Sequence, residues 1–154
     1  MISRRNIRVK VMQTLYGLDL QKEEPKPGDA VKILEKHFEQ TRQLFVYLVY
    51  FLTELARYAE TDSKLRSAKH LPSDQDKNVN IKLAGNEMVR KILEHDSFQK
   101  ALKTDKPQMI LDNELTRKLY QELKQTEEYK KYISLDSRDK KSEKEMLLMP
   151  LALG

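Results

Sequence analysis

The N-terminal segment carries apolar residues at the spacing of an amphipathic helix. Over residues 3–22 the apolar positions recur at steps of three or four, and the stripe is Ile7, Val11, Leu15 and Leu18. At 100° per residue these positions lie within about 80° of one another on a helical wheel. Ser3 stands directly ahead as a candidate N-cap. The pattern predicts a helix over residues 3–22 whose apolar stripe faces a core.

A second and longer helix is predicted from Asp29 to about Ala59. Pro25, Pro27 and Gly28 break the chain ahead of it, and Asp29 can cap its start. It contains the run "LFVYLVYFL", residues 44–52, nine apolar residues in a row. A membrane span needs about 20 such residues. We therefore expect no membrane span, and we expect this run to be the most buried part of a long central helix.

The chain after this helix divides into a polar segment and several short helices. Residues 61–86 lack periodicity, and we interpret them as a polar linker or insertion. Short helices are expected near 87–95, 98–103, 113–124, 129–135 and 142–148, with Asp112 capping the third. Only four Gly and five Pro stand among 154 residues, which favours helices over strands. The sequence thus predicts an all-α helical bundle with a long central helix and short C-terminal helices.

Two pairs of these short helices are similar in sequence. "NEMVRKIL" at 86–93 is similar to "NELTRKLY" at 113–120, and "FQKAL" at 98–102 to "YKKYI" at 129–133. The similarity indicates either an internal duplication or convergence of helices rich in Lys and Glu. A duplication would produce helix pairs that stack and bury one another.

Composition excludes several kinds of chemistry. The chain has no Cys, so disulfides, thiolate metal sites and Cys nucleophiles are excluded. Its three His residues lie far apart, without a ligand spacing, and no phosphate-binding loop or nucleophile motif is present. We expect no metal, no cofactor and no enzymatic activity, and the absence of a signal-peptide pattern favours a cytoplasmic protein. The net charge of +5 permits a nucleic-acid partner.

The cations of the first helix are the candidate binding site. Arg5, Met12 and Tyr16 lie within about 40° of one another on the helical wheel, with Arg8 about 40° to one side. We predict that they form a strip flanking the core stripe. Arginines beside an aromatic ring suit single-stranded nucleic acid, because Arg pairs with phosphates and Tyr stacks on bases. The alternative is a structural helix border whose cations pair with acids elsewhere in the chain.

The segment "RRNIRVKVMQTLY", residues 4–16, resembles the opening helix of the NusB family of transcription antitermination factors. That helix has a basic cluster, a further Arg and then an apolar-Gln-x-Leu-Tyr run. The matching positions are Arg4, Arg5, Arg8, Gln13, Leu15 and Tyr16. The remaining chain, to about residue 148, more loosely resembles expanded NusB homologues of Bacteroidetes-type bacteria.

This resemblance implies a NusB-like bundle that binds boxA-type single-stranded RNA. In the family, binding occurs with the ribosomal protein NusE, within an antitermination complex of RNA polymerase. At the matching positions, the resemblance implies that Arg4, Arg5 and Arg8 contact RNA phosphates or bases. It implies that Tyr16 stacks on a base or supports the same surface. Asn6 replaces the third basic residue of the cluster seen in many members.

The C-terminal part departs from the family. In the family, a later Phe-x-Asn-Gly-x-Leu segment forms much of the NusE surface, and no such segment is present in this chain. We therefore interpret 1–60 as NusB-like helices, 61–86 as a linker, and 87–154 as an inserted helical region with a truncated end. Apolar faces left uncovered by the missing part would favour a homodimer.

Two alternatives remain at this point. In the first, the chain is a non-catalytic helical module that docks a protein partner, and the cations of its first helix pair with an acidic surface of that partner. Alternatively, it would be the NusB-like RNA-binding domain of a ribosomal-RNA methyltransferase, although nothing in it resembles a methyl-donor site.

Overall fold

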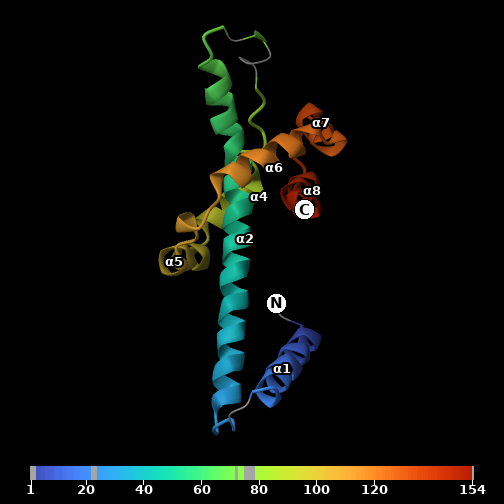
Figure 1. Ribbon diagram of the computed structural model, residues 1–154. Coiled ribbons are helices and arrows are strands. Elements are labelled where there is room, and N and C mark those ends of the chain that lie inside the picture. The colour runs from blue at the N-terminus through green and yellow to red at the C-terminus, as the bar shows by residue number, and fades with distance from the viewer. Residues whose placement is uncertain (1–2, 22–23, 72, 75–78, 154) are drawn as a thin grey trace. The chain divides into compact units, whose positions relative to one another are not determined.

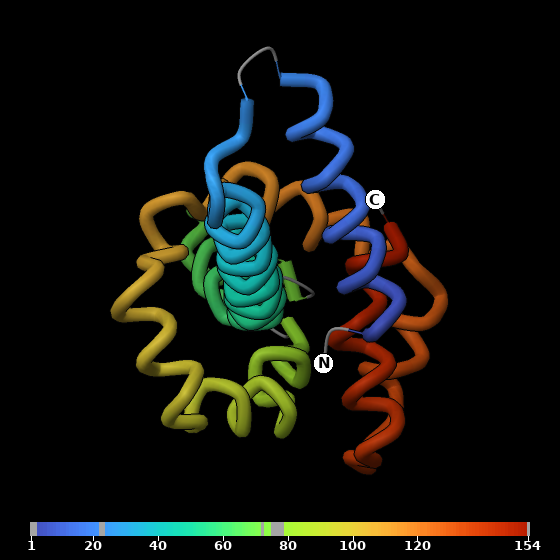
Figure 2. Tube along the Cα trace, turned by 90° about the horizontal axis from the view of Figure 1, so that it is seen from below, coloured from blue at the N-terminus to red at the C-terminus, as the bar shows by residue number. Residues whose placement is uncertain are grey.

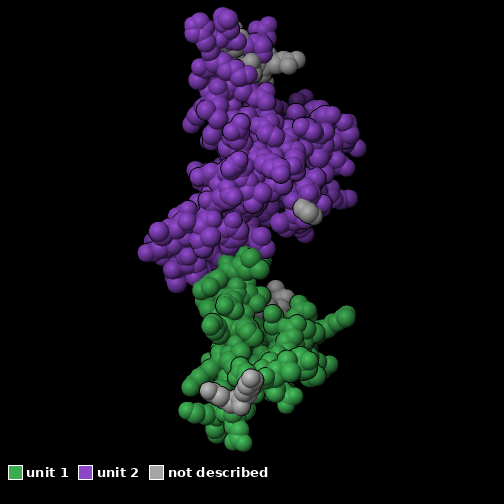
Figure 3. All heavy atoms as spheres, viewed as in Figure 1, with its two compact units in different colours: residues 1–45 green, residues 46–154 purple. Residues whose placement is uncertain are grey.

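The protein forms two compact helical units, as a computed structural model shows. The structure describes residues 3–21, 24–71, 73–74 and 79–153, and these residues form helices and connecting turns without a strand. The predicted all-α fold is confirmed. Unit 1 is Met1–Phe45 and unit 2 is Val46–Gly154, coloured separately in Figure 3. The division falls inside the long helix, whereas the sequence pattern placed boundaries after residues 60 and 86.

Unit 1 is a pair of antiparallel helices (Figure 1). Helix α1, Arg4–Asp19, begins where predicted, because the Ser3 hydroxyl accepts a hydrogen bond from the Asn6 N–H at 3.2 Å. Gly28 has a φ of 92°, which an L side chain rarely adopts, at the turn into α2, Asp29–Ser67. The Asp29 carboxylate accepts a hydrogen bond from the Lys26 N–H and fixes this turn. Helix α2 thus begins as predicted but continues eight residues beyond Ala59.

The apolar stripe predicted for α1 is largely uncovered. Leu18 is buried, but Ile7 and Leu15 are exposed, and Val11 is half-buried. The other buried residue of α1 is Thr14, whose hydroxyl lies 3.4 Å from His37 Nδ1 of α2. The prediction that this stripe faces a core was therefore wrong for most of its length. One neighbouring helix covers only a narrow strip, and the four-residue stripe needs more than one partner.

The core of unit 2 forms around the C-terminal half of α2. Its buried members on α2 extend from Phe51 to Ala59, and the other elements add Leu83, Val89, Tyr120, Leu123, Tyr129, Tyr132, Met146 and Leu147. The prediction that the run 44–52 is the most buried stretch was wrong, because Leu44, Phe45 and Leu48 are exposed. Burial on α2 is set by where the short helices surround it, which the apolar run does not reveal (Figure 2).

The short helices of unit 2 follow the predicted order. They are α4 (Glu87–Glu94), α5 (Asp96–Asp105), α6 (Asn113–Gln125), α7 (Glu127–Ser134) and α8 (Lys140–Leu148), with 3₁₀ turns at Pro107–Met109 and Met149–Ala152. Asn86 and Asp112 cap α4 and α6 through their side-chain oxygens. One residue, His95 or Thr126, both ends the first helix of each predicted repeat and caps the second. A single capping residue between the two helices of each pair is compatible with an internal duplication, which stays a prediction.

Much of the predicted linker 61–86 is ordered against the core. Residues 61–67 belong to α2, and Asp62 is buried and pairs with Lys124 of α6 at 3.0 Å. Near its other end, Leu83 is buried and Lys82 Nζ donates to the carbonyls of Tyr132 and Leu135. Residues 72 and 75–78 lie outside the described residues. The start of this segment is therefore helical, and its end packs against the core of unit 2.

A buried carboxylate joins α8 to α4 and α7. Glu143 of α8 is 1% exposed, and its Oε2 accepts a hydrogen bond from the Glu87 N–H at 2.6 Å. Its Oε1 accepts from Tyr132 Oη at 2.9 Å and from Arg138 Nη1 at 3.3 Å. The Asn86 side chain donates to the Glu143 carbonyl at 2.9 Å. The contacts with Asn86 and Glu87 hold α8 against the start of α4, and the contact with Tyr132 holds it against α7, so this residue helps to fix how the three helices pack.

Within the part of the chain that the structure describes, no helix is both long enough and apolar enough to span a bilayer. Helix α2 has the length, but charged side chains interrupt its apolar sequence.

Candidate nucleic-acid interface

The arginines of α1 are directed to solvent. Arg4, Arg5 and Arg8 are all exposed, and Lys10 is half-buried. Tyr16 is 67% exposed, so its ring is available for contact with a ligand. The four residues predicted from the sequence to bind RNA are therefore all accessible on one helix of unit 1.

These arginines have no acidic partner among the described residues. The side chains of Arg4, Arg5 and Arg8 form no ion pair or hydrogen bond there. Two arginines of α2 do pair, each with an acid of its own helix: Arg42 with Glu39 at 2.6 Å and Arg57 with Glu54 at 2.9 Å. In this respect α1 differs from the structural helix border, which would pair its cations with acids elsewhere. Unpaired guanidinium groups remain free to bind an anion in both of their donor directions.

The position of the strip on α1 differs from the prediction. The buried direction of the helix lies between Thr14 and Leu18. Arg5, Met12 and Tyr16 lie about 140–180° from that direction at 100° per residue, so they occupy the middle of the solvent side. The prediction of a strip flanking the core was wrong, because the helix packs through a face rotated away from Leu15.

The solvent side of α1 is apolar as well as cationic. Met12 is 67% exposed and Leu20 is 65% exposed, and both lie on the same side as Tyr16. An ordinary solvated helix face carries mainly polar and charged residues. A face that combines arginines with a tyrosine and exposed aliphatic side chains instead has the composition of a binding surface.

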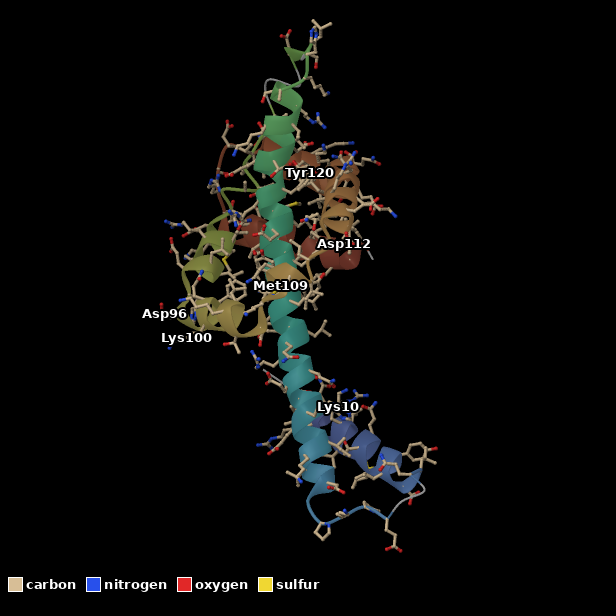
Figure 4. The ribbon with its side chains drawn as sticks, turned by 60° about the vertical axis from the view of Figure 1, so that its left-hand side comes forward. Lys10, Asp96, Lys100, Met109, Asp112 and Tyr120 are labelled. Atoms are coloured by element: carbon tan, nitrogen blue, oxygen red, sulfur yellow. The ribbon has the colours of Figure 1, made fainter. Side chains whose placement is uncertain are left out.

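A cavity lies beside this strip, inside unit 1. It measures about 270 Å³ and is lined by Asn6, Val9, Lys10 and Gln13 of α1 and by Phe38 and Thr41 of α2. Figure 4 shows Lys10 on the side of α1 that is next to α2. The α1 members follow the spacing i, i+3, i+4 and i+7, which is one helix face. The sequence does not reveal this cavity, because only the pairing of α1 with α2 brings Phe38 to that face.

Several ionisable side chains of unit 2 lie in its core. Burial raises the pKa of Tyr120, Tyr129 and Tyr132, which are members of the unit 2 core. Among the described residues no group of three or more His, Asp or Glu side chains is arranged to hold a metal ion. The exposed arginines and tyrosine of α1 remain the candidate site that the sequence predicts.

Comparison of the chain with protein-family models, with curated proteins and with solved structures finds no match.

Proposed function

We propose that this protein binds single-stranded RNA through α1 of unit 1. The observation that carries the proposal is the group of three exposed arginines without acidic partners, on the helix that also exposes Tyr16. Arg4, Arg5 and Arg8 would bind phosphates, and the Tyr16 ring would stack on a base.

A single strand fits this surface better than a duplex. The bases of a single strand are free to stack on aromatic side chains, whereas the bases of a duplex are stacked on one another. Tyr16 and Met12 offer the flat and apolar contacts that such bases need, and a surface that bound only duplex phosphates would have no use for them.

The NusB-like pattern of α1 extends the proposal to a cellular role. We propose that the RNA is of the boxA type and that the protein acts with NusE in an RNA polymerase antitermination complex. The role is non-catalytic and cytoplasmic. It is supported by the match of Arg4, Arg5, Arg8 and Tyr16 to the opening helix of NusB.

A second candidate function is docking of a protein partner on the same helix. It is favoured by the exposed aliphatic side chains of Met12, Leu15 and Leu20, which an RNA strand covers only in part. The two functions differ in their dependence on salt, since RNA binding releases counterions from the strand.

The salt dependence of RNA binding tests the proposal. Each phosphate neutralised on a single strand adds about 0.7 to the magnitude of the slope of log K against log salt. Replacing Arg5 and Arg8 together by Gln should flatten that slope by roughly 1–1.5 and weaken binding to every sequence.

The matched control replaces Arg117 and Lys118 of α6 by Gln. Both residues are exposed, and their loss changes the net charge by the same amount in unit 2. The control should bind as the parent does. An equal effect of the two double variants, with helical content unchanged in both, would show that RNA responds only to net charge and would contradict a site on α1.

A further inference from the structure

The cavity of unit 1 is open to solvent and combines apolar surface with polar side chains that have no protein partner among the described residues. Val9 and Phe38 supply apolar surface, Asn6 and Gln13 supply side-chain amides, and Lys10 supplies an ammonium group. Its volume of about 270 Å³ is slightly below the usual range of about 300–1,000 Å³ for drug-sized ligands. A single planar ring system with polar edges fits such a space.

The two amides are free of partners within the described part of the chain. The side chains of Asn6 and Gln13 form no hydrogen bond there. The hydroxyls on the same helices are already engaged, since Thr14 donates to the Lys10 carbonyl and Thr41 to the His37 carbonyl. Each amide offers a donor pair and an acceptor side by side, which matches the alternating donors and acceptors along the edge of a nucleobase.

We propose that this cavity holds one unstacked nucleobase of the bound RNA and reads its identity. The base would lie against Phe38 and Val9, and its polar edge would meet the amides of Asn6 and Gln13. Proteins that recognise RNA sequence commonly splay single bases out and bind them through such edges. The inference rests on the proposed RNA-binding function and adds a source of sequence preference to it.

The cavity is placed where a strand bound to the arginines would reach it. Val9, on its wall, follows Arg5 by four residues and is therefore its neighbour on the helix surface. It also lies about 20° from Tyr16 on the helical wheel. Phosphate contacts position a strand without reading its sequence, and base contacts specify it. The arginines would thus supply affinity, and the cavity would supply selectivity.

The test compares binding of four homopolymeric single strands, of A, C, G and U, to the full chain. The parent should prefer one base by roughly five- to hundredfold, the range that one good base contact provides. The double variant Asn6→Ala with Gln13→Ala should bind the four strands nearly equally, at the affinity of the weaker ones, with an unchanged salt slope. Gln40→Ala, an exposed amide of α2, is the matched control and should keep the preference.

The outcomes separate the two proposals. If the parent binds RNA but discriminates no base, or the double variant keeps the preference while remaining helical, the cavity assignment is wrong and RNA binding by α1 stands. If the parent binds no RNA, the proposed function fails. In that case NMR titration with the four nucleoside monophosphates still decides the cavity. The assignment would be supported if only one of the four nucleotides changed the chemical shifts of the Asn6 and Gln13 side-chain amides. It would be overturned if none of them did.

Discussion

The two units are built from similar helices but differ in how much of their apolar surface is buried. Among the described residues of unit 1, only Thr14 and Leu18 are buried. Every member of the main apolar core belongs to unit 2, from Phe51 to Leu147. Exposed apolar side chains are correspondingly dense in unit 1, including Met12, Tyr16 and Phe45.

The contrast indicates that unit 2 provides most of the stability and that unit 1 provides the exposed surface for binding. Unit 2 has a core, capped helices and a buried Glu143 network, so its packing specifies the fold. Unit 1 covers about 45 residues, a size at which a chain buries too little surface to be very stable alone. The apolar and cationic side chains that it leaves uncovered are those that the proposed RNA site uses.

The largest expected difference concerns one helix that contributes to both units. Leu55 is 1% exposed in the core of unit 2, and Leu44, also on α2, is 57% exposed in unit 1. Leu55→Ala should lower the free energy of unfolding by about 2–5 kcal/mol through a cavity, and Leu44→Ala by less than about 0.5 kcal/mol. Urea denaturation followed by circular dichroism measures both. Equal losses would contradict the location of the core.

A smaller effect is expected from the buried carboxylate of α8. Glu143→Ala leaves the Tyr132 hydroxyl and the Glu87 N–H without their acceptor, whereas Arg138 still donates to the Gly85 carbonyl. We expect a loss of about 2–3 kcal/mol, because unsatisfied buried donors are costly. Glu145→Ala is the matched control, since that side chain is 66% exposed, and it should be nearly neutral. A neutral Glu143→Ala would show that the contact between α4 and α8 does not depend on this network.

The smallest effect on stability is expected at the binding surface. Tyr16→Ala should leave the unfolding curve unchanged, because the ring is exposed, and should weaken binding of a single strand by about 1–3 kcal/mol through lost stacking. Tyr16→Phe keeps the ring and should bind as the parent does. Fluorescence anisotropy with a labelled RNA measures both variants. If Tyr16→Ala bound RNA with unchanged affinity, the proposal that the Tyr16 ring stacks on a base would be wrong.

The starts of three helices were predicted well, because their capping signals are local. Ser3, Asn86 and Asp112 each precede their helix and accept hydrogen bonds from its first N–H groups, as the sequence indicated. The extent of α2 was underestimated, since its last two turns are polar on the outside and contain the buried ion pair of Asp62 with Lys124. A polar sequence there indicated a loop, whereas α6 supplies the partner.

Burial was predicted poorly, because it depends on contacts distant in sequence. The run 44–52 is apolar throughout, yet Phe45 is exposed and Ala59, outside the run, is fully buried. For the candidate site, the arginines of α1 stand out in the sequence. Their lack of acidic partners and the cavity against Phe38 required the arrangement of the helices.

The central claim is that RNA binds unit 1 and not the better packed unit 2. Ultraviolet crosslinking of a single strand containing photoreactive uridines, followed by mass spectrometry of the peptides, tests it without any substitution. We expect crosslinks within residues 4–20, with Tyr16 among them, and their loss at high salt. Crosslinks confined to residues 87–153 would contradict it.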